Sequence, residues 1–268
     1  MSDNITKMFS LAVMVVVIGV FASVTKAQEV VFWDNFESDI AGTSPTSDDL
    51  DPVIGAGDIG GNWLIDESDP AGVQVVNNAA IADAPITGNN FLHITRGNPG
   101  EPRGDAWATG WDIAKTAGPQ LVKLDFSLHM PSDGGRGFGF AMGGPNQWDE
   151  IATGVNFYED GDIKNAKNNE SPPIDLVIAI EEWQQASLLI DLVNKTFDVT
   201  VEGSTATGIP FRDALSTKIQ WLLFSLAQNE SHLYVDNVQL SVVPEPSAIA
   251  LLGFSLTGVL VFARRRRR

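Results

Sequence analysis

Hydrophobic and polar side chains alternate along much of the chain, which is the pattern of half-buried β-strands. The clearest run is Leu121–Met130, in which apolar residues occupy every second position. Ser187–Leu192 and Thr196–Glu202 alternate in the same way, and Asn194-Lys195 between them supplies a tight turn. We therefore predict antiparallel strands in these segments, with the last two joined as a hairpin.

Shorter apolar runs predict further strands, and Gly, Pro, Asp and Asn residues separate them. No helical period lasts for three turns between the two ends of the chain. The pattern predicts an all-β fold in which two antiparallel sheets pack face to face as a jelly-roll sandwich. The shorter strands are expected at Val30–Trp33, Trp63–Ile65, Val73–Val76, Phe91–Thr95, Phe138–Met142, Val155–Tyr158, Ile174–Ile180 and Trp221–Leu226.

The last predicted strand contains a change of phase. Leu233 and Val235 share one parity, whereas the later apolar residues up to Val242 share the other. All of them can reach the core only if one extra residue stands at Asp236-Asn237. This arrangement is the signature of a β-bulge, which aims a polar side chain out of register.

The two ends of the chain carry longer apolar segments. Residues 8–22 follow Lys7 and predict a signal peptide, residues 1–27, that signal peptidase removes after Ala27; a retained N-terminal anchor is the alternative. Residues 247–263 predict a transmembrane helix, since 17 residues reach about 25 Å. The positive-inside rule would hold the following arginines in the cytoplasm and the globular part outside. These arginines are Arg264, Arg265, Arg266, Arg267 and Arg268.

Pro244, Glu245 and Pro246, followed by the apolar helix and the arginine cluster, resemble the PEP-CTERM sorting signal of Gram-negative-type bacteria. The resemblance implies that an exosortase, a membrane protease, cuts near Pro-Glu-Pro and releases or transfers the protein. An ordinary tail anchor is the alternative. We therefore expect a signal peptide over 1–27, a β-sandwich domain over 28–243 and a sorting tail over 244–268. The protein would be anchored transiently in the inner membrane and then reach the cell surface or extracellular matrix.

The charge of the middle segment narrows the range of partners. Residues 28–243 hold 10 basic and 32 acidic side chains, a net charge of −22. Such a surface argues against nucleic acid binding, which requires basic residues that displace counterions. The chain has no cysteine, so no disulfide stabilises the exported domain.

Several strand motifs resemble the concanavalin A-like lectin/glucanase jelly roll, and galactose-binding-like jelly rolls are the nearest alternative. The resemblance implies a glycan-related role. It is carried by Asp34–Glu37, Trp183, Leu188–Asp191, Lys195–Val199, Val201–Gly203 and Tyr234–Val238.

The sequence offers little for catalysis. Of His93, His129 and His232, none lies in a His-Glu-x-x-His spacing, and we expect His93 and His129 to be solvated on sheet faces. The acidic doublets Asp149-Glu150 and Glu181-Glu182 would point to opposite faces of a strand, so neither forms a glycosidase pair by itself. We predict a non-catalytic protein, with a glycan-active hydrolase or lyase of the same fold as the alternative.

A structural calcium ion is the one cofactor that the pattern suggests. The first and last strands are neighbours in many jelly rolls, which would bring Asp34 and Glu37 close to the bulged Asp236. Carboxylate oxygens are ligands that calcium prefers. The alternative is that these acids accept hydrogen bonds from local backbone amides.

Tryptophans are the candidates for contact with a polysaccharide ligand. Trp107, Trp111 and Trp148 lie in Gly- and Pro-rich segments, where exposed rings could stack on sugars. Core packing is the alternative for each of them. The other four, Trp33, Trp63, Trp183 and Trp221, are assigned to the core. We therefore expect an exported glycan-binding or matrix module of exopolysaccharide, and a purely structural matrix protein is a third possibility.

Overall fold

A computed structural model describes thirteen segments of the chain. Its strands lie in one compact unit, Val30–Val242, apart from the terminal strand residues Glu29 and Val243. These two are the only described residues of the other unit, Met1–Glu29 with Val243–Arg268. The predicted signal peptide, sorting tail and transmembrane helix therefore lie outside the described residues. No helix in the described part is long and apolar enough to cross a membrane. The described segments are 29–37, 39–45, 62–65, 72–77, 90–96, 105–114, 121–132, 138–144, 151–158, 160–165, 173–213, 216–226 and 231–243.

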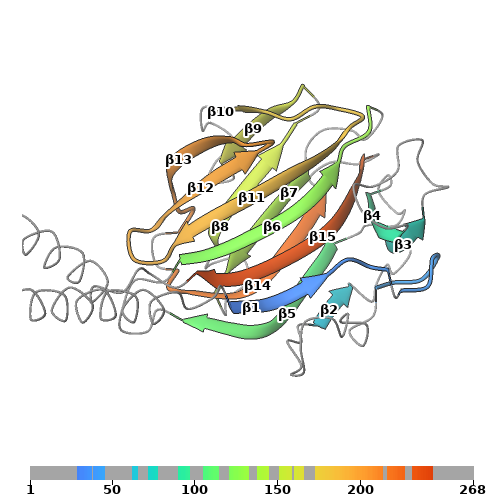
Figure 1. The fold of residues 1–268 in the computed structure, drawn as a ribbon, viewed down its shortest axis with the longest axis horizontal. Coiled ribbons are helices and arrows are strands. Elements are labelled where there is room, and N and C mark those ends of the chain that lie inside the picture. The colour runs from blue at the N-terminus through green and yellow to red at the C-terminus, as the bar shows by residue number, and fades with distance from the viewer. Residues whose placement is uncertain are drawn as a thin grey trace, which may run out of the picture. The chain divides into compact units, whose positions relative to one another are not determined.

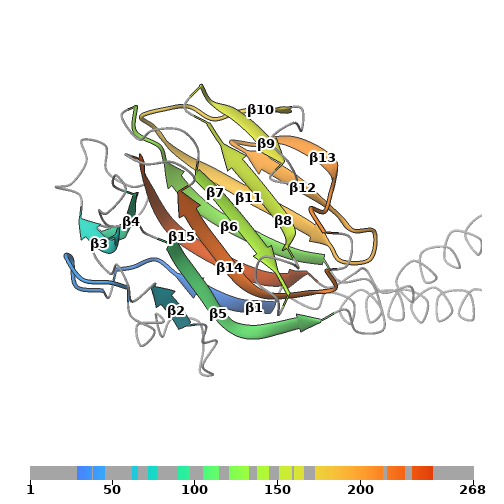
Figure 2. The same cartoon turned by 180° about the vertical axis from the view of Figure 1, so that it is seen from behind.

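Fifteen strands in this part of the chain form two antiparallel sheets (Figures 1 and 2), which confirms the predicted all-β sandwich. The eight-stranded sheet has the order β13-β12-β11-β6-β15-β4-β3, and β1 also pairs with β15. Its strands are β13 (Ser204–Pro210), β12 (Thr196–Val201), β11 (Trp183–Asp191), β6 (Leu121–His129), β15 (Ser231–Val243), β4 (Asn90–Arg96), β3 (Val73–Asn77) and β1 (Glu29–Asp34).

The seven-stranded sheet has the order β10-β9-β8-β7-β14-β5-β2 (Figure 2). Its strands are β10 (Pro173–Val177), β9 (Asp162–Asn165), β8 (Ile151–Phe157), β7 (Phe138–Gly143), β14 (Lys218–Leu226), β5 (Asp105–Ala114) and β2 (Asn62–Ile65).

The alternation in the sequence places the core between the two sheets. On β6, Phe126 is fully buried and meets Phe140 of β7 and Phe224 of β14 edge to face, with ring centroids 5.5 and 5.4 Å apart. Such edge-to-face contacts between aromatic rings add to the stabilisation from burying apolar surface. On β6 the polar residues between the apolar ones lie on the outer face.

The predicted hairpin and bulge are both confirmed. Asp191 accepts hydrogen bonds at 2.8 Å from the backbone N–H groups of Val193 and Asn194, and Lys195 closes the turn with a φ of 59°. At the bulge, Asn237 has a φ of 51°, so it is the extra residue that changes the phase of β15.

Three strands were missed by the sequence prediction, and each lacks regular alternation. On β5 the register with β14 shifts between Ile219 and Trp221, so the apolar residues change parity within the strand. β9 has only four residues. β13 lies at the edge of its sheet with most of its residues exposed, so it needs no apolar face.

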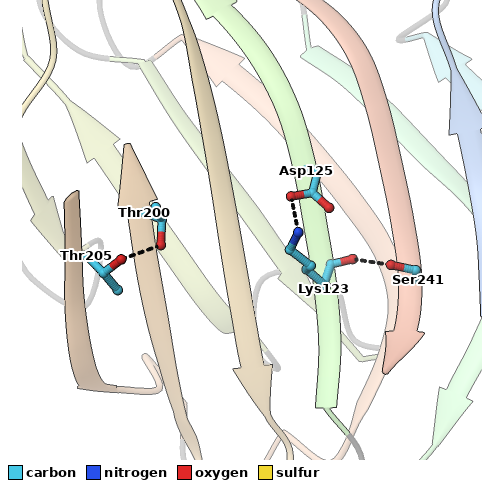
Figure 3. Close-up of polar contacts among 5 residues, drawn as sticks. All are labelled: Lys123, Asp125, Thr200, Thr205 and Ser241. Atoms are coloured by element: carbon cyan, nitrogen blue, oxygen red, sulfur yellow. Dashed lines mark hydrogen bonds and ion pairs between the residues drawn. The ribbon is translucent and has the colours of Figure 1, made fainter. Parts of the chain in front are cut away.

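Polar groups pair on part of the outer face of the eight-stranded sheet (Figure 3). Lys123 forms an ion pair with Asp125 at 2.7 Å, and the Ser241 hydroxyl donates to the Lys123 carbonyl. Thr200 and Thr205 bond to each other across β12 and β13 at 2.9 Å. A face of this kind is suited to contact with water.

Candidate functional site

The pairing of β1 with β15 places the predicted acidic residues near one another. Asp34 is 4% exposed, and its two carboxylate oxygens accept hydrogen bonds from the Phe36 backbone N–H at 2.8 Å and from Trp63 Nε1 at 2.6 Å. Glu37 is exposed and accepts a bond from the backbone N–H of Asn90 at 2.9 Å. The hydrogen bonds from local backbone amides, which the sequence offered as the alternative to calcium, are therefore present.

Asp236, at the bulge, is the least exposed member of this acidic cluster, which we define as Asp34, Glu37 and Asp236. It has no exposed surface, and its carboxylate accepts bonds from the backbone N–H and the side-chain amide of Asn237 at 2.7 and 3.0 Å. Burial raises the pKa of Asp236 to about 7, with the Asn237 N–H opposing the rise and the charges of Glu37 and Asp34 adding to it. The ionised form of Asp236 is therefore disfavoured at this position, chiefly by burial.

A raised carboxyl pKa is also typical of a general acid in glycosidases. Asp236 does not have the access that this role requires, because no part of its surface reaches solvent. Among the residues that the structure describes, no three His, Asp or Glu side chains lie close enough to hold a metal ion. The calcium ion stays a prediction.

Trp107 lies on the outer face of the seven-stranded sheet. Its strand neighbours Ala106 and Ala108 belong to the core, whereas the Trp107 ring packs on Trp221 with centroids 5.2 Å apart. Trp221 and Leu223 are buried within a small hydrophobic cluster that is separate from the core. Trp107 itself is half-buried, so part of its surface reaches solvent.

Small and polar residues share this face with Trp107. Ala141 of β7 stands between Leu223 of β14 and Gly154 of β8 in the register of the sheet, and Ala141 packs against the small hydrophobic cluster. Polar side chains flank them, namely Thr109 opposite Trp221 and Asn156 opposite Lys164.

The structure separates Trp107 from Trp111. Trp111 follows the change of register in β5 and packs against the core, with its ring centroid 5.2 Å from that of Phe32. The two rings therefore do not form one stacking platform. Trp148 lies outside the described residues. Sugar stacking by any of the three remains a prediction.

The core assignment holds for Trp63 and needs correction for three tryptophans. Trp63 is 7% exposed and belongs to the core. Trp33 and Trp183 are only half-buried, because the core-facing positions of their strands are the neighbouring residues. Trp221 is buried, but it lies in the separate cluster on the outer face.

The histidines also differ from expectation. His129 is 2% exposed rather than solvated, because its ring lies among aromatic neighbours, 5.6 Å from Trp183 and 5.7 Å from Tyr234. His93 is half-buried and lies beside His232. Histidines on separate strands share no local motif, so sequence spacing contained no signal for this proximity.

The described part of the chain thus defines an acidic, disulfide-free β-sandwich. The family model for the PEP-CTERM protein-sorting motif matches residues 242–268, so the chain carries this sorting motif. The motif marks the chain as an exported protein that an exosortase sorts. The sequence matches no curated protein.

Solved structures with similar folds include both lectins and glycoside hydrolases. The catalytic domain of the glycoside hydrolase family 131 protein from Coprinopsis cinerea has a TM-score of 0.48 and 14% identity, covering 82% of this chain and 97% of its own. Lectin II from Ulex europaeus has a TM-score of 0.43 and 11% identity, covering 68% and 98%. A sialidase has a TM-score of 0.49 and 10% identity over 67% of this chain, which spans 17% of the sialidase. With these scores below 0.5, the fold assignment rests on the strands of the chain itself.

Proposed function

We propose that this protein is a non-catalytic glycan-binding module, which is held in the inner membrane by its C-terminal helix until an exosortase places it at the cell surface or in an exopolysaccharide matrix. The sorting motif at residues 242–268 supports export and sorting by an exosortase, and the partly exposed Trp107 on the outer face of the seven-stranded sheet supports glycan binding. In this topology Arg264–Arg268 are cytoplasmic and the β-sandwich is outside.

The outer face of the seven-stranded sheet is the proposed glycan-binding surface. Trp107 supplies a partly exposed aromatic ring, and Ala141, which packs on the same hydrophobic cluster, is small and partly exposed. Asn156 and Thr109 supply hydrogen-bonding groups at the edges of this area. An aromatic platform with a few polar groups is the usual composition of a sugar site. The acidic domain favours neutral glycans over acidic ones.

Glycan binding is tested with a glycan array and with Trp107→Ala. We expect the variant to lose affinity for the hits by roughly 5- to 30-fold, since a lost stacking contact is worth about 1–2 kcal/mol. Trp33→Ala is the matched control, because Trp33 is also half-buried and lies on β1 of the other sheet. Equal loss in both variants would contradict the assignment of this face.

The glycans that bind on the array also distinguish the non-catalytic module from an enzyme and from a structural matrix protein. Release of reducing ends or unsaturated products from a hit glycan would support the hydrolase or lyase and contradict the non-catalytic proposal. A complete absence of hits on a broad array would favour the structural matrix protein.

We also propose that the acidic cluster binds a structural calcium ion. The electrostatic interaction of Asp34 and Glu37 with the buried Asp236 supports it. Burial raises the pKa of Asp236 to about 7 and the charges of Glu37 and Asp34 add to the rise, so a divalent cation would stabilise the ionised carboxylates. Binding would have to draw the three carboxylates closer together than they stand in the described structure. We expect calcium at 100 times its Kd to stabilise the protein by about 3 kcal/mol, raising the Tm by several degrees. A Tm at pH 7.5 that is identical in calcium and in chelator would refute the site.

A further inference from the structure

All three histidines of the chain gather on the outer face of the eight-stranded sheet. Their rings surround Tyr234 of β15, with centroids at 4.5 Å for His93, 5.7 Å for His129 and 5.9 Å for His232. His93 lies on β4, His129 on β6 and His232 on β15. The order of the strands in the sheet, rather than spacing in the sequence, produces this cluster.

His93 and His232 face each other through ring nitrogens. Tyr234 is opposite His93 and Thr95 is opposite His232 in the β4–β15 register, so the two histidines are diagonal neighbours on one face. The His93 Nε2 atom lies 3.4 Å from His232 Nδ1. Hydrogen bonds from N–H groups are commonly about 2.9–3.0 Å long, so this separation is long for a direct bond.

The same separation fits two imidazole ligands of one metal ion. Zinc lies about 2.0–2.1 Å from each histidine nitrogen in tetrahedral geometry, which puts two such nitrogens about 3.4 Å apart. The ring centroids are 5.6 Å apart, and ideal coordination would bring them to about 5.2 Å through a tilt of each ring. The χ2 torsion of histidine is broad, so a small tilt is accessible.

We propose that His93 Nε2 and His232 Nδ1 bind a divalent late transition-metal ion, of which zinc is the representative, with water at the remaining positions. Imidazole nitrogen suits zinc, copper and nickel, whereas calcium and magnesium require oxygen ligands. The described residues supply no third His, Asp or Glu at this place, so the ion keeps open positions. The site is therefore chemically distinct from the acidic cluster.

Two further observations favour the ion. Both rings are half-buried and reach solvent. The net charge of −22 over residues 28–243 raises the local concentration of cations.

The test uses the full chain in mild detergent, without a polyhistidine tag, with its histidines labelled with nitrogen-15. Zinc is titrated in millimolar magnesium, which occupies carboxylate sites. Because the chain has only three histidines, each ring is followed separately by NMR. We expect saturable 1:1 binding that shifts the ring nitrogens of His93 and His232 and leaves those of His129 unchanged. Unchanged nitrogens at saturating zinc, or a shift at His129 alone, would overturn the site.

Variants provide a second measurement. We expect His93→Gln and His232→Gln each to weaken zinc binding roughly tenfold or more, because one of two ligands is lost. His129→Gln is the matched control and should retain the wild-type affinity. Circular dichroism identifies any variant that fails to fold, and the NMR titration of the wild-type chain then decides. Retained affinity in both single variants would overturn the proposal.

Discussion

Replacing Asp236 with asparagine is expected to stabilise the protein in chelator by an amount that grows from pH 4 to pH 7. The pKa of Asp236 rises from 3.8 to about 7 in the folded state, so its contribution to stability is complete below pH 3.8 and is lost as the pH rises through 7. The difference corresponds to at most about 4 kcal/mol. Asparagine has the shape of the protonated acid and no charge, so the Asp236→Asn variant avoids this loss.

Chemical denaturation of both proteins between pH 4 and pH 8.5, always with chelator, measures the effect. The matched control is Asp125→Asn, which removes a partly exposed ion pair with Lys123 and should change stability by less than about 1 kcal/mol. If the free energy of unfolding changed with pH in parallel for the wild type and Asp236→Asn, the destabilising charge on buried Asp236 would be contradicted. Added calcium should reduce the difference in stability between the two proteins, because only the wild type retains all three proposed calcium ligands.

His93 adds a pH dependence of the opposite sign to the wild-type curve. Its pKa falls from 6.5 to about 4, so its contribution to stability is complete above pH 6.5 and is lost as the pH falls through 4. The contribution of His93 is present in both the wild type and Asp236→Asn, so it cancels when their free energies of unfolding are subtracted. The comparison therefore isolates the carboxyl even though the two groups titrate over overlapping ranges.

The sandwich could be predicted because one face of most strands is buried. Leu121–Met130 and Thr196–Glu202 show this directly, and the phase change at Asp236-Asn237 predicted the bulge that the φ of Asn237 confirms. The neighbourhood of Asp34 and Asp236 was predicted from the fold class, because the first and last strands are neighbours in many jelly rolls, and β1 does pair with β15.

Features that depend on strand order or on the second face of a sheet were not predictable. His93 and His232 meet only because β4 lies beside β15. Trp221 is as buried as a core residue but lies outside the core, since both faces of β14 are covered with hydrophobic neighbours. A strand that is apolar on both faces does not reveal which face is the inner one. The sequence could therefore predict that Trp221 is buried, but not that it lies in the cluster on the outer face rather than in the core.

Substituting Pro244, Glu245 and Pro246 together with alanine is expected to remove the mature protein from the cell surface. An uncut tail keeps the apolar segment 247–263 and the five arginines, and moving each arginine through the bilayer centre costs about 2.5–3.5 kcal/mol. Moving all five arginines through the bilayer centre would therefore cost about 12–18 kcal/mol. The uncut chain should therefore stay in the membrane fraction rather than be released slowly.

Cell fractionation with intact-mass measurement, in a bacterium that encodes an exosortase, tests this expectation. The wild-type surface form should lack Arg264–Arg268, whereas the triple variant should remain full length after signal-peptide removal and be found with the membrane. Alanine at Pro99, Glu101 and Pro102 is the matched control, because it removes the same residue types elsewhere in the chain. A wild-type surface form with an intact C-terminus would refute processing at the tail. Normal release of the triple variant would show that cleavage does not depend on the Pro-Glu-Pro residues, and the role of the tail would then rest on the helix and arginines alone.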